Sequence, residues 1–249
     1  FTQNTTDLLE RQIEVSGVKV AILMCEGMIN LQLFTQIMVR PLSSLEIQDA
    51  DGAAVAHWVS KQTVLSGAQK DFLTYDELFT SLMAGFVVLL HHGVDRGIAC
   101  GMQGFSFRSV SEPSTEMNIS GSREGFVEPI RINQTMIRRR IRPPSLKFEM
   151  FPVGEKSRTD ICMVYLTDTV DQRLVESLRK ALRSVSSVIV PSQGHLWPHL
   201  EGKPLSPFSS VGTTERPDTL CAKINEGRIG ILVDGTPFAL IVPYLFSEN

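Results

Sequence analysis

Blocks of apolar residues alternate with polar segments along the chain, and the first blocks predict a strand followed by helices. The apolar run VKVAILMCEGMI at 18–29 predicts a buried strand. The next segment, LQLFTQIMV, predicts a helix that ends before Pro41, because proline disrupts a helix interior. A short helix is expected around 53–60, inside an otherwise mixed region.

A helix and a strand pair follow in the same part of the chain. Thr74 and Glu77 have the spacing of a capping box, apolar residues then form one helix face, and Gly85 closes the helix. The apolar runs FVVLLH and GIACGMQ predict two strands that pair across a loop at 93–96. These elements together predict a first α/β unit.

A polar segment rich in turn formers separates this unit from a second series of elements. After SEPSTEMNISGS at 111–122, the pattern predicts a long arginine-bearing helix that is stopped by Pro143 and Pro144. The runs LKFEMF and DICMVYL then predict two strands.

The remaining pattern predicts two further helices and a hairpin. Thr169 and Gln172 offer a second capping box before a helix face formed by Leu174, Leu178 and Leu182. Residues 185–216 give no clear pattern. TERPDTLCAKINEG has the proline-early, glycine-late asymmetry of a short helix, and RIGILVDGTPFALIV predicts a hairpin around Asp-Gly with strands apolar on both faces.

This succession predicts the α/β class, with two small α/β subdomains that have mixed sheets and are joined by a short linker. The expected boundaries are 1–110 for the first subdomain, 111–122 for the linker and 123–249 for the second. No internal repeat is visible in the sequence.

Composition restricts the possible functions. Lys and Arg total 24 against 27 Asp and Glu, so the net charge of −3 disfavours a nucleic-acid-coating role, and a basic site must be local. The longest apolar stretch, at 237–246, is about half of the roughly 20 residues that a membrane span requires. The widely spaced cysteines indicate buried thiols in a reducing compartment; they are Cys25, Cys100, Cys162 and Cys221.

The arginine helix is the main candidate for an interaction site. At about 100° per residue, Arg131, Arg138 and Arg142 form one stripe about 16 Å long, bordering an apolar stripe expected to face the core. That apolar stripe contains Phe126, Ile130, Ile137 and Ile141.

Acidic residues project on the arginine side of the same predicted helix. Glu124 and Glu128 lie there, and Glu128 is spaced to pair with Arg131. No local acidic partner is expected for the arginines at the helix end: Arg138, Arg139, Arg140 and Arg142. Three interpretations remain open: a solvated helix end, a contact with a subunit or domain, and binding of lipid phosphate or a small anion.

Catalytic motifs are not found. There is no GxGxxG after a strand, no GxxxxGK[ST], no GxSxG and no HExxH. Asp49 and Asp51 resemble a calcium loop poorly, and His195 and His199 are separated by a proline. His91 and His92 are expected in a surface loop. The sequence therefore favours a non-enzymatic protein without cofactor or metal.

Three separated blocks of the second half resemble a known family. GSREGFVEPIRINQTMIRRRI, TERPD at 214–218 and ILVDGTPFALIVP at 231–243 are similar to the A subunits of the GerA family of spore germination proteins. Ser122 stands where the family commonly has proline, which leaves the start of the predicted helix less rigid. Residues 1–110 resemble the family only in the order of their elements.

The resemblance implies a function and a location. It implies the soluble N-terminal part of a germinant receptor subunit in the spore inner membrane or cell membrane, facing the cytoplasm or spore core, with membrane-spanning helices beyond the C-terminus. It also implies a transporter-like B subunit and a lipoprotein C subunit as partners, with a response to small nutrients that triggers ion release. It carries over no catalytic residues.

Two functional hypotheses follow from the residues and the resemblance together. The first is a non-catalytic domain for receptor assembly and signal coupling, with possible self-association. Its interaction candidates are Glu124, Glu128, Arg131, Arg138, Arg139 and Arg142. The alternative is a small-molecule binding module that holds a nutrient germinant in the cleft between the two subdomains.

Overall fold

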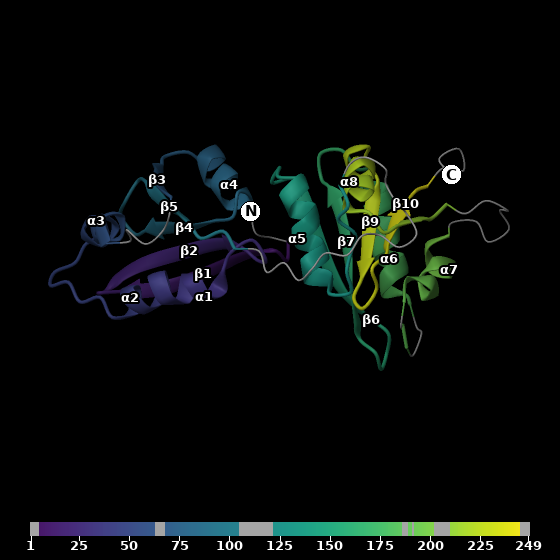
Figure 1. The fold of residues 1–249 in the computed structure, drawn as a ribbon, viewed down its shortest axis with the longest axis horizontal. Helices are drawn as coiled ribbons and strands as arrows, with labels where there is room; N and C mark the ends of the chain where they lie inside the picture. Colours follow the sequence, from purple (N-terminus) through teal and green to yellow (C-terminus); the bar gives the residue numbers. More distant parts are fainter. Residues whose placement is uncertain are drawn as a thin grey trace. The chain divides into compact units, whose positions relative to one another are not determined.

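The computed structural model describes residues 5–62, 68–104, 122–185, 189–190, 192–201 and 210–244. Contacts between residues divide the chain into two compact units (Figure 1). The described part of the first unit begins at Asp7, and that of the second comprises Thr5, Thr6 and the residues from Ser122 onward. Apart from Ser122, the expected linker at 111–122 lies outside the described residues.

The first unit contains a five-stranded sheet with the order β1-β2-β4-β5-β3. All its pairings are antiparallel, whereas mixed sheets were expected. The predicted pairing of FVVLLH with GIACGMQ is confirmed as β4 with β5. The strands are β1 (Leu8–Val15), β2 (Val18–Cys25), β3 (Gln69–Phe72), β4 (Phe86–His91) and β5 (Gly97–Gly101).

Helical segments connect β2 to β3, and one further helix connects β3 to β4. The predicted helix before Pro41 is continuous but extends beyond that proline: α1 (Leu31–Phe34) leads into the π-helical turn η1 (Thr35–Val39) and then α2 (Arg40–Ser43). Pro41 directly follows the π-helical turn, in which the amide of Arg40 donates to the carbonyl of Thr35 five residues earlier. The other helices are α3 (Gly52–Gln62) and α4 (Tyr75–Met83).

The second unit has a five-stranded antiparallel sheet with the order β6-β7-β9-β10-β8. The strands are β6 (Leu146–Val153), β7 (Thr159–Leu166), β8 (Gly212–Thr214), β9 (Ile229–Val233) and β10 (Ala239–Val242). The helical elements are α5 (Ile130–Arg140), α6 (Gln172–Arg183), the 3-10 turn η2 (Gln193–His195), α7 (Trp197–Leu200) and α8 (Pro217–Asn225). The two α/β subdomains expected from the sequence are thus present.

Local signals located several elements correctly, with one exception at α6. The capping box of Thr74 and Glu77 is formed at the start of α4, with both reciprocal hydrogen bonds present. The N-cap of α6 is Asp171, whose carboxylate accepts from the amide of Arg173, so the expected box at Thr169 is wrong. Aspartate is a preferred N-cap residue, and here the N-cap stands two residues after Thr169.

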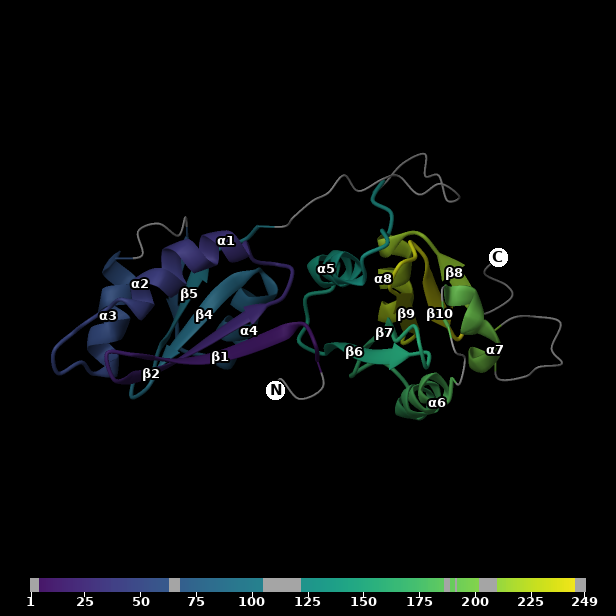
Figure 2. The same cartoon turned by 90° about the horizontal axis from the view of Figure 1, so that it is seen from below.

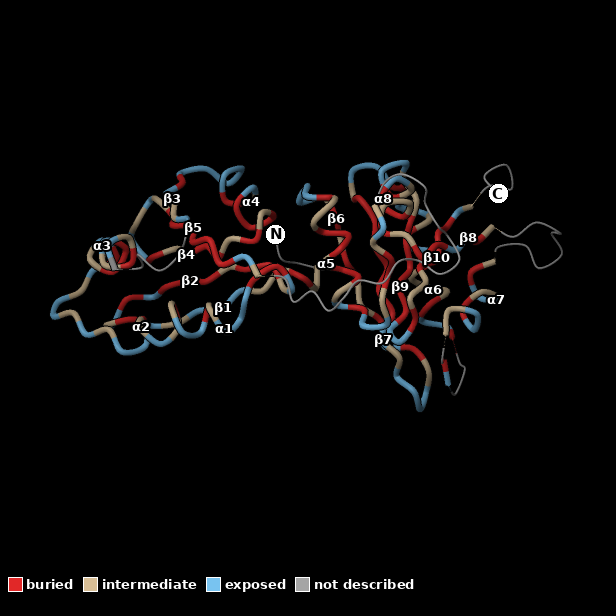
Figure 3. Tube along the Cα trace, viewed as in Figure 1, coloured by how far each residue is buried: buried red, intermediate tan, exposed pale blue. Residues whose placement is uncertain are grey.

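Each sheet separates two apolar cores. In the first unit, α1, α2 and α3 pack on one face and α4 on the other; in the second, α6 and α7 pack opposite α5 and α8 (Figure 2). Most residues of the central strands are buried on both faces (Figure 3). This explains their nearly continuous apolar sequences.

The two units repeat one topology, which the sequence did not reveal. Each consists of a hairpin, a helical connection, a short edge strand, a nine-residue helix and a second hairpin that inserts beside the first. Gly85 and Gly227 follow α4 and α8 at the same distance and have similar left-handed φ values of 80° and 87°. No repeat is visible in the sequence itself, so the repeat exists in the backbone arrangement.

The register of the repeat explains a difference between the two sheets. Leu8 and Leu146 occupy corresponding positions at the start of the first strand, and two residues later Glu10 corresponds to Phe148. Phe148 is buried in the core beneath α5, whereas Glu10 is exposed. No helix corresponding to α5 is found among the described residues of the first unit. The position of Glu10 is therefore open to solvent, and a charged side chain suits it.

Candidate functional site

The three family-like blocks of the sequence meet in the second unit. The amide of Phe126 donates to the carbonyl of Glu215 at 2.7 Å. The amide of Ile130 donates to Oδ1 of Asp234 at 3.0 Å, and the amide of Gly235 donates to the carbonyl of Glu128 at 2.9 Å. Segments far apart in the sequence therefore form one site, which we call the three-block junction (residues 122–130, 214–218 and 234–235).

Asp234 holds the start of α5. The preceding Pro129 has no side-chain acceptor, so the carboxylate from the β9–β10 turn satisfies a free amide of the first helical turn. The turn itself is fixed, because the amide of Asp234 donates to the backbone carbonyl of Asp160 and Gly235 adopts a left-handed φ of 83°.

The segment before Ile130 is not helical, which corrects the expected helix start near residue 123. Asn133 explains part of this conformation. Its side-chain amide donates to the carbonyl of Val127 at 2.5 Å, and its Oδ1 accepts from the amide of Val127 at 2.9 Å. Phe126, Glu124 and Glu128 consequently do not belong to the helical stripes predicted for them.

Arg138 is buried, with 2% of its surface exposed, so it lies inside the core rather than along the border of the apolar stripe, where the helical projection placed it. Its guanidinium donates to the carbonyls of Leu146 (2.9 Å) and Pro143 (3.3 Å), just beyond the helix end. It also lies over the ring of Phe148, 5.0 Å from the centroid. Arg138 thus connects α5 to the turn that begins β6.

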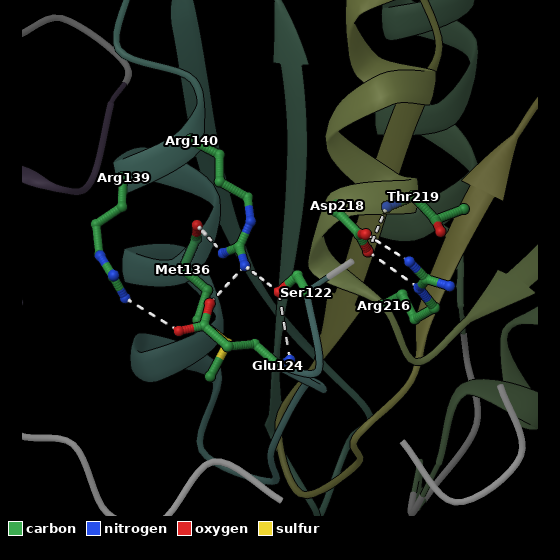
Figure 4. A network of polar contacts seen from close by, with 8 residues as sticks. All are labelled: Ser122, Glu124, Met136, Arg139, Arg140, Arg216, Asp218 and Thr219. Carbon is green, nitrogen blue, oxygen red and sulfur yellow. Dashed lines mark hydrogen bonds and ion pairs between the residues drawn. The ribbon is translucent and has the colours of Figure 1, made fainter. Parts of the chain in front are cut away.

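Glu124 supplies acidic partners that the sequence analysis did not find. Arg140 forms a hydrogen-bonded ion pair with it, and Arg139 lies 3.7 Å from its other oxygen (Figure 4). Arg140 also donates to the carbonyl of Met136 and to Oγ of Ser122. Ser122 therefore provides a hydroxyl contact that a proline at this position could not make.

Arg216 and Asp218 form the adjacent part of the junction (Figure 4). Two guanidinium nitrogens of Arg216 contact the carboxylate of Asp218 at 3.1 and 2.5 Å, at the first turn of α8. These hydrogen bonds hold the pKa of Asp218 below its usual value. The pair and Pro217 together fix the start of the helix.

The structure separates the predicted interaction residues. Arg138 is in the core, and Glu124 and Arg139 take part in the half-buried pairing described above. The other three residues are exposed. Glu128 lies at the junction, Arg131 lies near the start of α5, and Arg142 lies just after its end. These three remain on the surface as contact candidates.

Chemical groups suited to catalysis are scarce in the described residues. No group of three or more His, Cys, Asp or Glu residues there could hold a metal ion. The four cysteines are buried and form no disulfide among the described residues, and burial raises the pKa of Cys221 to about 12. His91 is also buried rather than in a surface loop, because it is the last residue of β4 and lies on the same side of that strand as the core residue Leu89.

A polar network in the second unit was not anticipated. Arg179 of α6 contacts both carboxylate oxygens of Glu149 on β6, at 2.9 and 2.6 Å, and Tyr165 of β7 donates to the same carboxylate. Burial favours the protonated form of Glu149, but the hydrogen bonds from Arg179 and Tyr165 outweigh it and lower its pKa. These residues are far apart in the sequence, so no local spacing could reveal them.

Comparison with known proteins identifies one family along the whole chain. The sequence model of the Bacillus/Clostridium GerA spore germination protein family matches residues 1–249. Spore germination protein KA of Bacillus subtilis (strain 168) is 29% identical over 98% of this chain, and spore germination protein GerLA of Bacillus cereus is 30% identical over 97%. The chain spans 45% and 49% of these two relatives, about half their length.

A solved structure has the same fold. The N-terminal domain of the A subunit of the Bacillus megaterium spore germinant receptor GerK3 matches 97% of this chain and 90% of its own, with a TM-score of 0.74 and 27% identity. Another relative, YfkQ of Bacillus subtilis, is described as a membrane protein and is 30% identical over the full chain. Within the described residues, no helix has the length and apolarity to cross a membrane.

Proposed function

The chain belongs to the GerA family of spore germination proteins, and on this premise we propose that it is a non-catalytic domain that couples a germinant receptor to ion release. In this proposal, the surface around the exposed residues Glu128, Arg131 and Arg142 docks onto another receptor subunit. We refer to these three residues as the docking surface.

The observation that carries this proposal is the three-block junction. It fixes α5 at its first turn through Asp234, while Arg138 fixes its last turn through the carbonyls of Pro143 and Leu146. A helix held at both ends moves with its sheet as one body. A force applied at Arg131 or Arg142 would therefore be transmitted to the second unit as a whole.

The chemistry of the docking surface suits a protein partner. An arginine side chain presents a planar fork of donors that matches carboxylates, and Glu128 adds an acceptor of opposite charge. Mixed charges favour a defined orientation between proteins more than general attraction to an anionic membrane. The partners we propose are the transporter-like B subunit and the lipoprotein C subunit, at the spore inner membrane with this domain on the cytoplasmic or core side.

Charge reversal in the whole A subunit tests the proposal. Arg142→Glu should leave the unfolding of the purified domain unchanged and slow nutrient-triggered ion release from spores at least about tenfold. Arg173→Glu is the matched control, because Arg173 is also an exposed arginine of the second unit but lies on α6. Normal germination of Arg142→Glu spores, or an equal defect in both variants, would reject the docking surface.

A further inference from the structure

A groove of about 1550 Å³ runs along the second unit between β6 and α6. Thr5 and Thr6 line one part of it, and strand residues including Lys147 and Tyr165 line another. The helix contributes a polar stripe at helical spacing: Gln172, Glu176, Arg179 and Arg183. Figure 2 shows α6 beside β6, and residues of β6 and β7 line the groove together with this helix.

Arg179 is held rigidly within this groove. Its Nε and Nη2 atoms bind the two oxygens of Glu149, whose side chain is 11% exposed, and Tyr165 holds the same carboxylate from the next strand. A bidentate pair of this kind fixes both the position and the plane of a guanidinium. The arginine is thus oriented before any ligand arrives.

The remaining terminal nitrogen of Arg179 has a replaceable partner. Nη1 donates to Oε1 of Glu176 at 2.5 Å, and the Glu176 side chain is 71% exposed. Exposed ion pairs on one helix contribute little to stability, because solvent screens them and side-chain entropy opposes them. Another carboxylate that enters the groove can take this position without disturbing the buried pair with Glu149.

Further cations line the same groove. Arg183 lies one helical turn after Arg179, with its guanidinium 5.9 Å from the centroid of the Phe151 ring, and Lys147 lies on the strand that carries Glu149. Three cations of the groove, Lys147, Arg179 and Arg183, match its three carboxylates, Glu149, Glu155 and Glu176. A small anion with planar oxygens that displaces Glu176 keeps this balance and matches the donor fork of Arg179.

We propose that this groove binds a small carboxylate, one oxygen of which replaces Glu176 at Nη1 of Arg179. The exposed Glu176 then acts as an internal competitor that sets the affinity. The inference does not depend on the docking surface, since it concerns other residues and is measured by binding to the purified chain.

Three probes with one carbon skeleton test the proposal: propionate, propylamine and 1-propanol, each titrated to about 50 mM while amide chemical shifts are followed by NMR. Propionate alone should shift the amides that line the groove. Glu176→Gln should tighten propionate binding several-fold, and Arg179→Lys, which keeps the charge but loses the fork, should weaken it at least about tenfold. Arg173→Lys, on the same helix but outside the groove, is the matched control.

The outcomes separate a binding site from a structural brace. If the pair of Arg179 and Glu149 only holds α6 against β6, propionate should cause no saturable change in the amide chemical shifts. That result would overturn the proposal. Equal shifts with propylamine, or the same affinity in the Glu176→Gln and Arg179→Lys variants, would also overturn it. If the Arg142→Glu variant lost germination but still bound propionate, that result would bear on the docking surface and leave the groove proposal intact.

Discussion

Asp234 caps the helix that starts at Ile130, although 104 residues separate them in the sequence. N-caps are usually supplied by the residue immediately before a helix, and here Pro129 cannot serve. The cap therefore makes the start of α5 dependent on the correct formation of the β9–β10 turn.

Replacing Asp234 should destabilise the second unit. Asp234→Ala removes the acceptor for the Ile130 amide, and we expect a loss of roughly 1–2 kcal/mol in the free energy of unfolding, measured in urea. Asp234→Asn keeps a side-chain oxygen and should remain close to the wild type. Equal stability of Asp234→Ala and the wild type would show that the cap contributes nothing.

Arg138 and Arg142 should respond differently to the same substitution. Arg138→Met leaves the carbonyls of Pro143 and Leu146 without this donor, and we expect a cost of about 1–3 kcal/mol in unfolding experiments. Arg142→Met, at an exposed position, should change stability by less than about 0.5 kcal/mol. A neutral effect of Arg138→Met would mean that water satisfies these carbonyls.

His91 should make the first unit less stable in mild acid. Burial, followed by the positive charge of Arg96, lowers its pKa from 6.5 to about 4, and neither ring nitrogen has a hydrogen-bond partner within the described residues. Between these pH values the unfolded chain binds a proton that the folded chain excludes, so stability falls as pH decreases from 6.5 towards 4.

The magnitude of this effect can be measured directly. Between pH 7 and pH 5 the titration of His91 should cost roughly 2 kcal/mol of unfolding free energy. His91→Gln cannot titrate and should have a correspondingly smaller dependence on pH, whatever its stability at pH 7. Parallel pH profiles for the two proteins would exclude His91 as the source.

The cysteine thiols should be nearly unreactive in the folded chain. All four are buried, and the raised pKa of Cys221 leaves almost no thiolate at pH 8. Iodoacetamide should label them only after urea is added, as counted by mass spectrometry. Rapid labelling of Cys221 in the native protein would indicate that α8 opens frequently.

Local sequence patterns predicted elements whose determinants are near one another in the chain. The capping box at Thr74, the Pro217–Gly227 asymmetry of α8 and the Asp234–Gly235 turn all depend on residues within one element or its ends. Apolar periodicity likewise located most strands, because burial on both faces leaves continuous apolar runs. The repeated topology escaped notice, since it requires only that both halves keep the same order of elements.

The candidate site was predicted only in part, because its contacts are between distant segments. A helical projection placed Arg138 at the border of the buried face, but the carbonyls that it contacts belong to residues after the helix, which the projection does not include. Glu124 appeared to be one helical turn from Glu128, whereas the chain before Ile130 is not helical and brings Glu124 to Arg140. The pair of Glu149 and Arg179 links a strand to a helix 30 residues later.

The order of strands in the second sheet also affects synthesis of the protein. The β9–β10 hairpin lies between β7 and β8, so the edge strand β8 emerges from the ribosome before β10, its neighbour in the described sheet, has been translated. During that interval the nascent chain holds β8 unpaired and α5 uncapped. Translation of the last hairpin supplies both missing partners together, which makes completion of this unit a single late event.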